Sequence, residues 1–549
     1  MNRARFGRCA LASLLIARGA AAEPEPWSDP DGLGEPVRHE FGETGVSAGA
    51  EYRANWLYVN PITLNAERLR KLSVAEHRMR VDFAVDHLEK LRVVTSLDFI
   101  DGAVWGDNGV YGGNPSKNGG TRVAATWPNA SRLSVGYLGE GDDLDPNAYG
   151  YVYEPAPFVE VRRLYGEVTT GVGVFRIGRQ PTTDGTALLV ASGDGRANRF
   201  GYSGDGDTTD RILFATKPLE GLKPDAERDR SRDRGLFLIG FYDWAVNDSV
   251  HLFGDNLQGS GSAVRYLLPM PERRSHLELQ GNYAHRWEGV YDTNVNIFGL
   301  RAMARFDRLR LGAEGAWVYG GTREVSEALA LVNNDPIVRQ TIDQWGARAV
   351  ARWDEPSWTA YLEFDFASSD RNPNPGSDLT MFKFAEDANV GLLMFERVLQ
   401  YASWRSSAAG VTLLRRLGAV TFPNETVNTR GVFTNALALF PQFDVRPAEN
   451  LLFRAGVLAA WAPIGLVDPN ESLQNRDGIE YEDDLVNFNE GRPGNFYGVE
   501  LDGRISYTYL EHFIFDFESA ILFPGDAFQD ENGRAARSVL FQGRTTWVF

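Results

Sequence analysis

The chain has 549 residues and carries 74 acidic against 56 basic side chains, a formal net charge of −18. This balance argues against nucleic acid as a partner, because phosphate binding depends on basic surface that releases counterions. The only cysteine is Cys9, so neither a disulfide framework nor a cysteine-based metal site is expected. No stretch beyond the N-terminal residues approaches the roughly 18 consecutive apolar residues of a membrane-spanning helix.

The first residues have the order of a signal peptide. Arg3, Arg5 and Arg8 are followed by the short apolar stretch Cys9–Ala17, and Ala20–Ala22 forms a small-residue cleavage site. We therefore expect residues 1–22 to be removed on export. Residues 23–45, rich in proline and acidic side chains, are expected to form a periplasmic tail that is too short to plug a barrel.

Polar and apolar residues alternate with period two in many of the segments that follow. The segments 276–287, 345–353 and 499–509 each place charged or polar residues on one face and apolar or aromatic residues on the other. This pattern predicts β-strands with one apolar face. A soluble sandwich would also alternate, but its strands are usually about five or six residues long.

Aromatic residues gather near the ends of these segments, as in Trp56 with Tyr58 and Trp317 with Tyr319. Membrane barrels place such amphipathic rings at the lipid headgroups. Ordinary enrichment of aromatics in strands is the alternative interpretation.

The connections between segments are unequal in length. Asp307-Arg308, Asp354–Pro356 and Leu510-Glu511 are typical of tight turns. Long polar stretches lie between them: 101–120, 182–207, 320–340, 463–495 and 524–534. Short periplasmic turns that alternate with long extracellular loops are typical of an outer-membrane barrel.

These patterns predict an all-β fold, a transmembrane up-and-down antiparallel β-barrel over residues 46–549. We expect about 18 strands, within a range of about 16–22, because single-chain barrels close on an even number. Two places leave the count open. Thr121–Leu138 fits a hairpin or a loop, and the up-down order does not close between Asp370 and Arg446, where one strand is missed or invented.

The segment Phe382–Trp404 does not alternate. Its apolar residues, among them Phe384, Leu392, Phe395 and Leu399, recur at roughly helical spacing. A helix folded into the barrel mouth as a constriction fits this spacing, and so does a misread strand.

The last residues, Val539–Phe549, alternate and end on an aromatic residue. Such a strand is what barrel-assembly machinery typically reads, so we expect that machinery and outer-membrane lipid as partners.

Several stretches resemble outer-membrane barrels of the alginate-export type, and most closely the uncharacterised myxobacterial proteins of this kind. They are Phe175–Pro181 with its Gly-Arg-Gln end, Asp210–Phe214, Gly498–Asp502 and Phe523–Phe528. The resemblance implies a passive conduit with a charged lumen, in which Arg179 of the Gly-Arg-Gln end lies in the pore or at its mouth. Alginate export relies on a positive lumen, which this sequence does not plainly provide.

Alternation assigns charged residues of both signs to the lumen in nearly equal number. The pore-lining residues predicted by alternation are Arg176, Arg286, Arg348, Arg352, Arg504, Glu278, Glu314, Glu363, Glu500 and Asp502, and the resemblance adds Arg179. Cross-strand ion pairs between neighbours are one interpretation. A lumen polarised between an arginine wall and an acidic wall is the other.

Catalysis and cofactors are not expected. The seven histidines are scattered, and neither a Gly-x-Ser-x-Gly elbow nor a His-Glu-x-x-His motif occurs. The glycine- and aspartate-rich stretches Gly193–Gly195 and Gly204–Asp210 could offer oxygen ligands to calcium, but no glutamate closes an EF-hand spacing. A solvated outer loop is the favoured interpretation.

The sequence therefore predicts a porin-like channel in the Gram-negative outer membrane, for small polar or charged solutes or for an exported polysaccharide. The alternative is a structural or adhesive barrel whose lumen is blocked by Phe382–Trp404 and the long loops.

Overall fold

The computed structural model describes residues 37–106, 131–134, 152–155, 159–247, 257–399, 432–468, 486–487 and 494–549, with short gaps inside several of these ranges. The predicted signal peptide lies outside the described residues.

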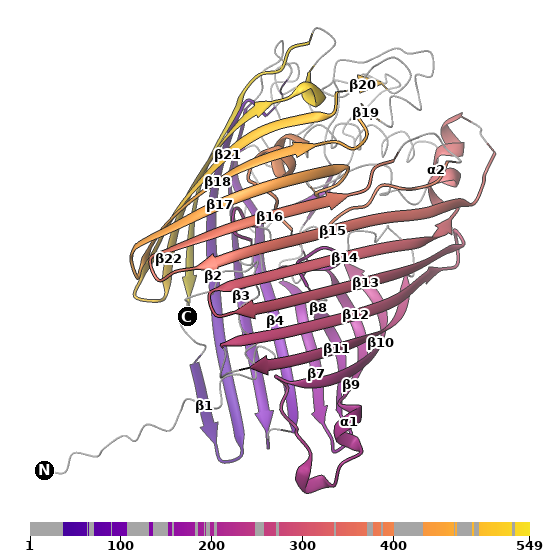
Figure 1. Cartoon of the computed structure of the whole chain (residues 1–549), viewed down its shortest axis with the longest axis vertical. Helices are drawn as coiled ribbons and strands as arrows, with labels where there is room; N and C mark the ends of the chain where they lie inside the picture. The colour runs from indigo at the N-terminus through magenta and orange to yellow at the C-terminus, as the bar shows by residue number, and fades with distance from the viewer. Residues whose placement is uncertain are drawn as a thin grey trace, which may run out of the picture.

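Eighteen strands form a closed antiparallel ring in which sequence neighbours pair with each other and β23 pairs with β2 (Figure 1). They are β2 (Thr44–Asn60), β3 (Leu72–His87), β4 (Leu91–Gly106), β7 (Val159–Thr169), β8 (Val174–Pro181), β9 (Thr208–Thr216), β10 (Gly235–Asn247), β11 (Gln258–Met270), β12 (Ser275–Glu288), β13 (Thr293–Phe306), β14 (Leu309–Thr322), β15 (Gln340–Asp354), β16 (Trp358–Ala367), β17 (Ala436–Ala448), β18 (Leu451–Trp461), β21 (Phe496–Tyr509), β22 (Phe513–Pro524) and β23 (Ser538–Val548). The predicted fold class and the expected strand number are confirmed.

One further strand, β1 (Val37–Phe41), pairs with the beginning of β2. It lies on the same edge of β2 as β23, which pairs with residues 51–60. The stretch expected as a tail therefore contains a strand, and β2 begins within it. At the other end of the chain, Phe549 exchanges backbone hydrogen bonds of 2.8 and 3.1 Å with Ala50.

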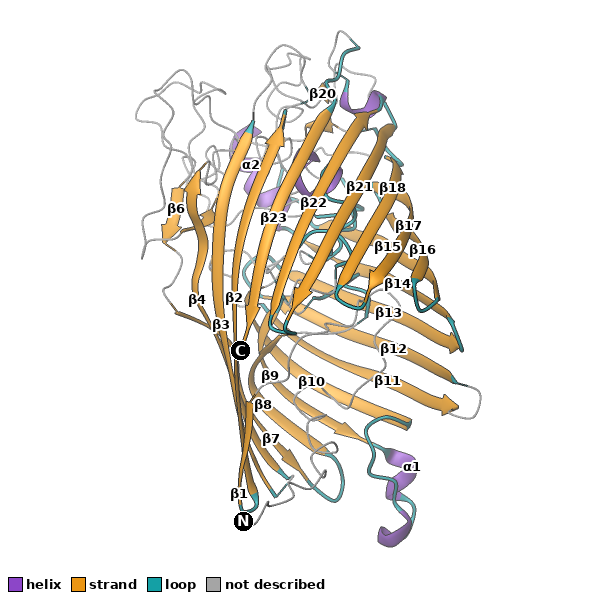
Figure 2. Cartoon of the chain, turned by 90° about the vertical axis from the view of Figure 1, so that its left-hand side faces the viewer, coloured by secondary structure: helices purple, strands orange, loops and turns teal. Residues whose placement is uncertain are grey.

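The connections divide between two rims of the barrel (Figure 2). The short-turn rim carries the tight turns, including the predicted ones at 307–308, 355–357 and 510–512. Its exception is the connection 217–234, which contains α1 (Pro218–Gly221). The loop rim carries nearly all the long connections, including the one with α2 (Glu324–Asn333). Among the described residues, no helix has both the length and the apolar composition needed to cross a membrane.

The structure places strands in both regions where the sequence leaves the strand count open. Between Asp370 and Arg446 the described residues contain a single barrel strand, β17. The up-down order of the sequence prediction did not close here because of the long connection before this strand. Within Thr121–Leu138, the strand β5 (Ser131–Ser134) pairs with β6 (Val152–Pro155) in a small separate sheet. The rest of that stretch lies outside the described residues.

Outward side chains of the strands are apolar and exposed, whereas inward ones are mostly polar and buried. On β22, for example, Phe515 and Phe517 are exposed, while Asp516 and Glu518 are buried. An apolar band on the outside is what lipid requires, because no water satisfies polar groups there. The barrel therefore crosses a membrane.

A charge on the outward face should destabilise the barrel according to its depth. We expect Phe517→Arg, in the middle of β22, to lower the free energy of unfolding in lipid by about 2–4 kcal/mol. Tyr509→Arg, at the short-turn end of β21, should cost only about 0–1 kcal/mol. Urea titration in lipid vesicles measures both values, and equal costs would contradict this orientation.

Candidate functional site

The inner wall of the barrel has two tiers on the side formed by β15 to β3. Toward the loop rim, inward side chains are apolar and form a collar: Leu57, Val59, Leu72, Val74, Ala436, Ala438, Phe440, Leu458, Ala460, Ala520, Leu522 and Leu540. Below the collar, inward side chains on the same strands are charged and form a belt: Glu51, Arg53, Arg78, Arg80, Asp444, Arg454, Asp502, Arg504, Asp516, Glu518 and Arg544.

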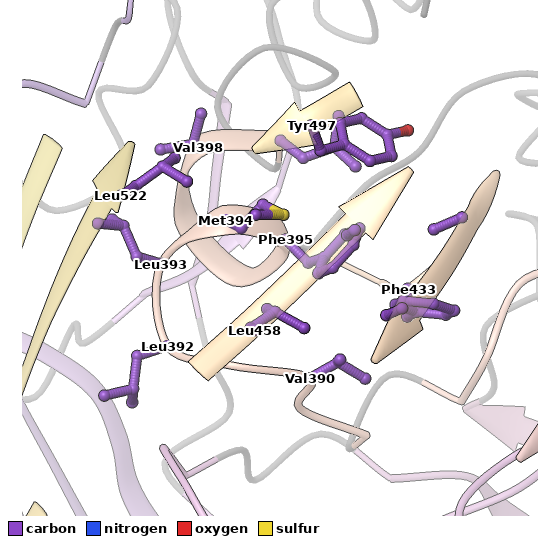
Figure 3. Packing of buried hydrophobic residues seen from close by; sticks show 14 of the residues in the cluster. Val390, Leu392, Leu393, Met394, Phe395, Val398, Phe433, Leu458, Tyr497 and Leu522 are labelled. Carbon is purple, nitrogen blue, oxygen red and sulfur yellow. The ribbon is translucent and has the colours of Figure 1, made fainter. Parts of the chain in front are cut away.

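The described part of Phe382–Trp404 packs inside the collar, and we call residues 377–385 with 388–399 the inner segment. It ends in a π-helical turn, Met394–Leu399, whose apolar side chains are buried against Leu458 and Leu522 of the wall (Figure 3). Phe395 also stacks edge-on against Phe433, with ring centroids 4.7 Å apart. The predicted constriction is thus supported over residues 382–385 and 388–399, and the strand interpretation of this part is wrong. Residues 400–404 lie outside the described residues.

A second segment from the loop between β8 and β9 crosses the belt, and we call residues 198–202 the strap. The Arg199 side chain donates to Asp444 at 2.8 Å and to Gln442 at 2.7 Å. Its backbone carbonyl accepts from Arg454 and, at 3.1 Å, from Arg504. These contacts attach one end of the strap to β17, β18 and β21.

The other end of the strap contacts the opposite side of the belt. The Gly201 amide donates to Glu518 at 2.9 Å. The Tyr202 hydroxyl donates to Glu51 at 3.2 Å, and the Arg53 guanidinium lies 3.6 Å from its ring centroid. The strap therefore spans the wall from β17 to β2.

The strap and the inner segment also contact each other. The backbone N–H of Asn389 donates a hydrogen bond to the side-chain oxygen of Asn198 at 3.1 Å. Just before the strap, the backbone of Thr186 donates to Glu314 at 2.7 Å and accepts from Arg348 at 2.7 Å. The two segments thus form one insert that is fixed to the wall at several strands.

Charged residues of the wall pair with neighbours on adjacent strands. Arg348 of β15 contacts Asp365 at 2.6 Å and Glu363 at 2.8 Å, both on β16. Arg544 of β23 contacts Asp516 of β22 at 3.0 Å. Burial makes such pairing necessary, because an isolated charge would be too costly there. Of the two interpretations of the lumen charges, the structure favours cross-strand ion pairs.

The structure places ten of the eleven predicted pore-lining residues on inward faces. Arg176, Glu278 and Arg286 lie on the wall away from the insert, and Arg352 pairs with Asp354 near the short-turn rim at 2.8 Å. The other six are Glu314, Arg348, Glu363, Glu500, Asp502 and Arg504, which lie around the insert.

Arg179 is the exception. It shares its face of β8 with exposed Ile177 and pairs with Asp210 of β9 at 2.9 Å, beside exposed Ile212. Alternation explains the error, because Arg176 faces inward and Arg179 is an odd number of residues away. Arg179 therefore does not line the lumen.

Arg199 and Tyr202 were not predicted as lumen residues, because they lie in a connection without periodicity. A signal in the sequence was an arginine and two aromatic residues within four positions of a loop rich in glycine and polar residues. Alternation also does not single out Asp444, which meets Arg199 and Arg454 at 2.8 Å each.

Away from the insert, the wall formed by β7 to β13 presents guanidinium groups. Arg176 keeps 31% of its side chain exposed while its partner Glu167 keeps 3%. Arg265 keeps 29% while its partner Glu278, which also binds Arg301 at 2.6 Å, keeps 1%. In these pairs the carboxylate lies against the wall and the arginine faces the lumen.

The long connection on the short-turn rim contributes to the same wall. Arg232 donates to Glu167 at 2.9 Å and to Thr169 at 3.2 Å. Within the connection, hydrogen bonds from Ser231 hold the pKa of Asp229 well below its usual value, with Lys217 and Arg234 nearby. Asp229 is therefore ionised at neutral pH and can fix the loop at this mouth.

The stretches considered for calcium have other partners where they are described. Asp207 accepts the Ala191 amide at 3.0 Å, and Asp210 pairs with Arg179. Within the described part of the chain, no group of three or more histidine, cysteine or acidic side chains is arranged to hold a metal ion.

Removing a buried arginine should cost far more than removing an exposed one. Arg348→Ala leaves Asp365 and Glu363 buried without their cation, and we expect a loss of about 3–5 kcal/mol in the free energy of unfolding. Arg274→Ala, which removes an exposed pair with Asp307, should cost about 0–1 kcal/mol. Denaturant titration of both variants in lipid measures this, and similar losses would contradict the structural role of the ion pairs.

No protein-family model matches the chain, and no curated protein matches it. Among solved structures, it is similar to Pseudomonas aeruginosa OccK2 (OpdF) in complex with glucuronate, with 10% identity, a TM-score of 0.44, and coverage of 91% of this chain and 98% of that one. It is also similar to P. aeruginosa OccK9 (OpdG), with 9% identity, a TM-score of 0.46, and coverage of 92% and 98%. A third is Acinetobacter baumannii OccAB1, with 9% identity, a TM-score of 0.44, and coverage of 92% and 96%. The resemblance to alginate-export barrels has no counterpart among these and stays a prediction.

Proposed function

We propose that this protein is a porin-like channel of the Gram-negative outer membrane that lets small polar or charged solutes pass. Barrels of this type, with apolar outer bands and polar interiors, belong to that membrane. An 18-strand barrel is also wide enough to leave an aqueous channel where its lumen is not filled by chain.

The observation that carries this proposal is the contrast between the two sides of the lumen. From β15 to β3 the insert covers the wall, and charged groups such as Asp444 and Glu518 are fully buried. From β7 to β13 the arginines Arg176 and Arg265 keep about a third of their side chains exposed. Exposed guanidinium groups inside a barrel require water beside them, so we place the solute path along this wall.

The small inward residues of β11 fit the same path. Gly259 and Ala263 face inward there with little side chain of their own, whereas the Phe241 ring of β10 covers Gly261. An off-centre path narrowed by the insert suits small solutes better than a polysaccharide, which makes export of a polymer the weaker part of the prediction.

A loop-blocked barrel with a structural or adhesive role is the second candidate. The insert supports it, because the strap spans the belt and the inner segment fills the collar. The two functions differ in whether ions cross the folded protein.

Conductance of the refolded protein in a planar bilayer tests the proposal. We expect stable open steps and, under a salt gradient, a reversal potential that shifts toward cations in Arg265→Gln. This variant removes an exposed positive charge, while Glu278 keeps its contact with Arg301 at 2.6 Å. Arg274→Gln, on the short-turn rim with 81% of its side chain exposed, is the matched control and should leave the reversal potential unchanged.

If a barrel shown to be folded and inserted gives no conductance steps, the open channel is rejected and the blocked barrel is favoured. Open steps whose reversal potential does not respond to Arg265→Gln would keep the channel but reject the path along β11 to β13.

A further inference from the structure

The inner segment is attached to the barrel wall at both ends: Leu379 pairs with the backbone of β15, and one carboxylate holds the part that leads into the helical turn. Glu500 of β21 accepts the backbone N–H groups of Leu392 and Leu393 at 2.7 and 2.8 Å on Oε1, and that of Met394 at 2.6 Å on Oε2. The side chain is completely buried. No other contact between the segment and the wall joins three consecutive amides to one side chain among the described residues.

The amides are available because they precede and begin a helical turn. The first N–H groups of a helix have no partner within it, and here they precede the π-helical turn Met394–Leu399. Gly391 has a φ of +76°, and a Cβ there would lie 2.9 Å from Glu500 Oε1. The chain therefore bends closely over the carboxylate, at a position where only glycine fits without strain.

Glu500 has no lysine or arginine partner among the described residues, unlike belt acids such as Asp516 and Glu518. The side chain of buried Asp502, two residues along β21, interacts with it. Glu500 lies in the collar, where its register partners are Leu458 and Leu522. The three N–H groups are therefore the hydrogen-bond donors that the segment supplies to this buried carboxylate, and charge-assisted hydrogen bonds of this kind are stronger than neutral ones. The segment thus supplies hydrogen-bond donors to the carboxylate, and the carboxylate supplies acceptors to the segment.

We propose that Glu500 is the positioning residue of the constriction: it holds the inner segment against the wall, and loss of its charge releases the segment toward the loop rim. The inference deepens the proposed function by naming the group that sets the width of the lumen. The attachment of the inner segment to Glu500 does not depend on conduction, so it can be correct even if the barrel is blocked.

The first test reads the position of the segment without relying on conduction. In a Cys9→Ser background the chain has no cysteine, so Val398→Cys, at a side chain now 2% exposed, gives a single thiol in the segment. A membrane-impermeant maleimide then labels this thiol when the segment leaves the wall. Adding Glu500→Gln should raise the labelling rate about tenfold or more. The carboxamide NH2 group of glutamine cannot accept a hydrogen bond, so at least one of the three backbone N–H groups loses its acceptor.

Glu288→Gln is the matched control. Glu288 is also a buried carboxylate near the loop rim that accepts consecutive amides, those of Val290 and, at 2.9 Å, Tyr291. It caps the turn between β12 and β13, and none of its hydrogen bonds among the described residues goes to the inner segment. It should leave the labelling of Val398→Cys unchanged.

A second variant covers the case in which Glu500→Gln does not fold. Gly391→Ala lies in the connection rather than in a strand, and its Cβ would meet Glu500 and, at 2.7 Å, Leu458. It should raise labelling in the same way with the barrel intact. Labelling that stays at the starting rate in both variants overturns the proposal, as does an equal rise in Glu288→Gln.

Single-channel recording separates this inference from the proposed function. A conducting protein whose Glu500→Gln variant opens to a larger level supports both. A silent protein that conducts only as Glu500→Gln supports the attachment and rejects the open channel. Unchanged conductance together with unchanged labelling rejects the attachment alone.

Discussion

Backbone pairing between β23 and β2 is the constraint on which the rest of the structure depends. In lipid an unpaired strand edge would leave a row of N–H and C=O groups without partners, so a spanning sheet must close. The ten paired positions from Glu51 to Asn60 close this one. Closure fixes the faces of all strands, since each side chain then points either to lipid or to the lumen.

Closure also turns many charged side chains toward an interior where some of them are shielded from water. Inward faces carry many acids and arginines, and those covered by the insert lose contact with water. Pairs such as Arg348 with Asp365 compensate this loss by charge-assisted bonds on adjacent strands. For Glu500, which has no arginine partner in the described part of the chain, backbone N–H groups take that role. Glycines of the wall make room for the insert: a Cβ on Gly346 would collide with Phe382, and one on Gly456 would lie 3.1 Å from Phe200.

The fold could be predicted because period-two alternation reports directly on which side of a strand meets lipid. The same rule identified Glu278, Arg348 and Arg504 as inward, since each lies an even number of residues from others on its face. The rule was not followed at Arg179, which a family motif placed in the lumen and the parity of β8 places on the outward face. It could not find Arg199 or Tyr202, because a loop that crosses a lumen has no period, and its partners lie 150 to 250 positions away in pairs such as Tyr202 with Glu51 and Arg199 with Asp444.

The arrangement of charge around the lumen follows from where the insert lies. On the covered side both partners of a pair are buried, so their fields largely cancel at close range and the pair serves stability. On the side of β7 to β13 the carboxylates Glu167 and Glu278 are buried beneath arginines that remain in contact with water. The wall can therefore be balanced in total charge and still present positive groups to a solute. A sequence count of acids and bases cannot reveal this difference, because it depends on which member of each pair is exposed to water in the folded barrel.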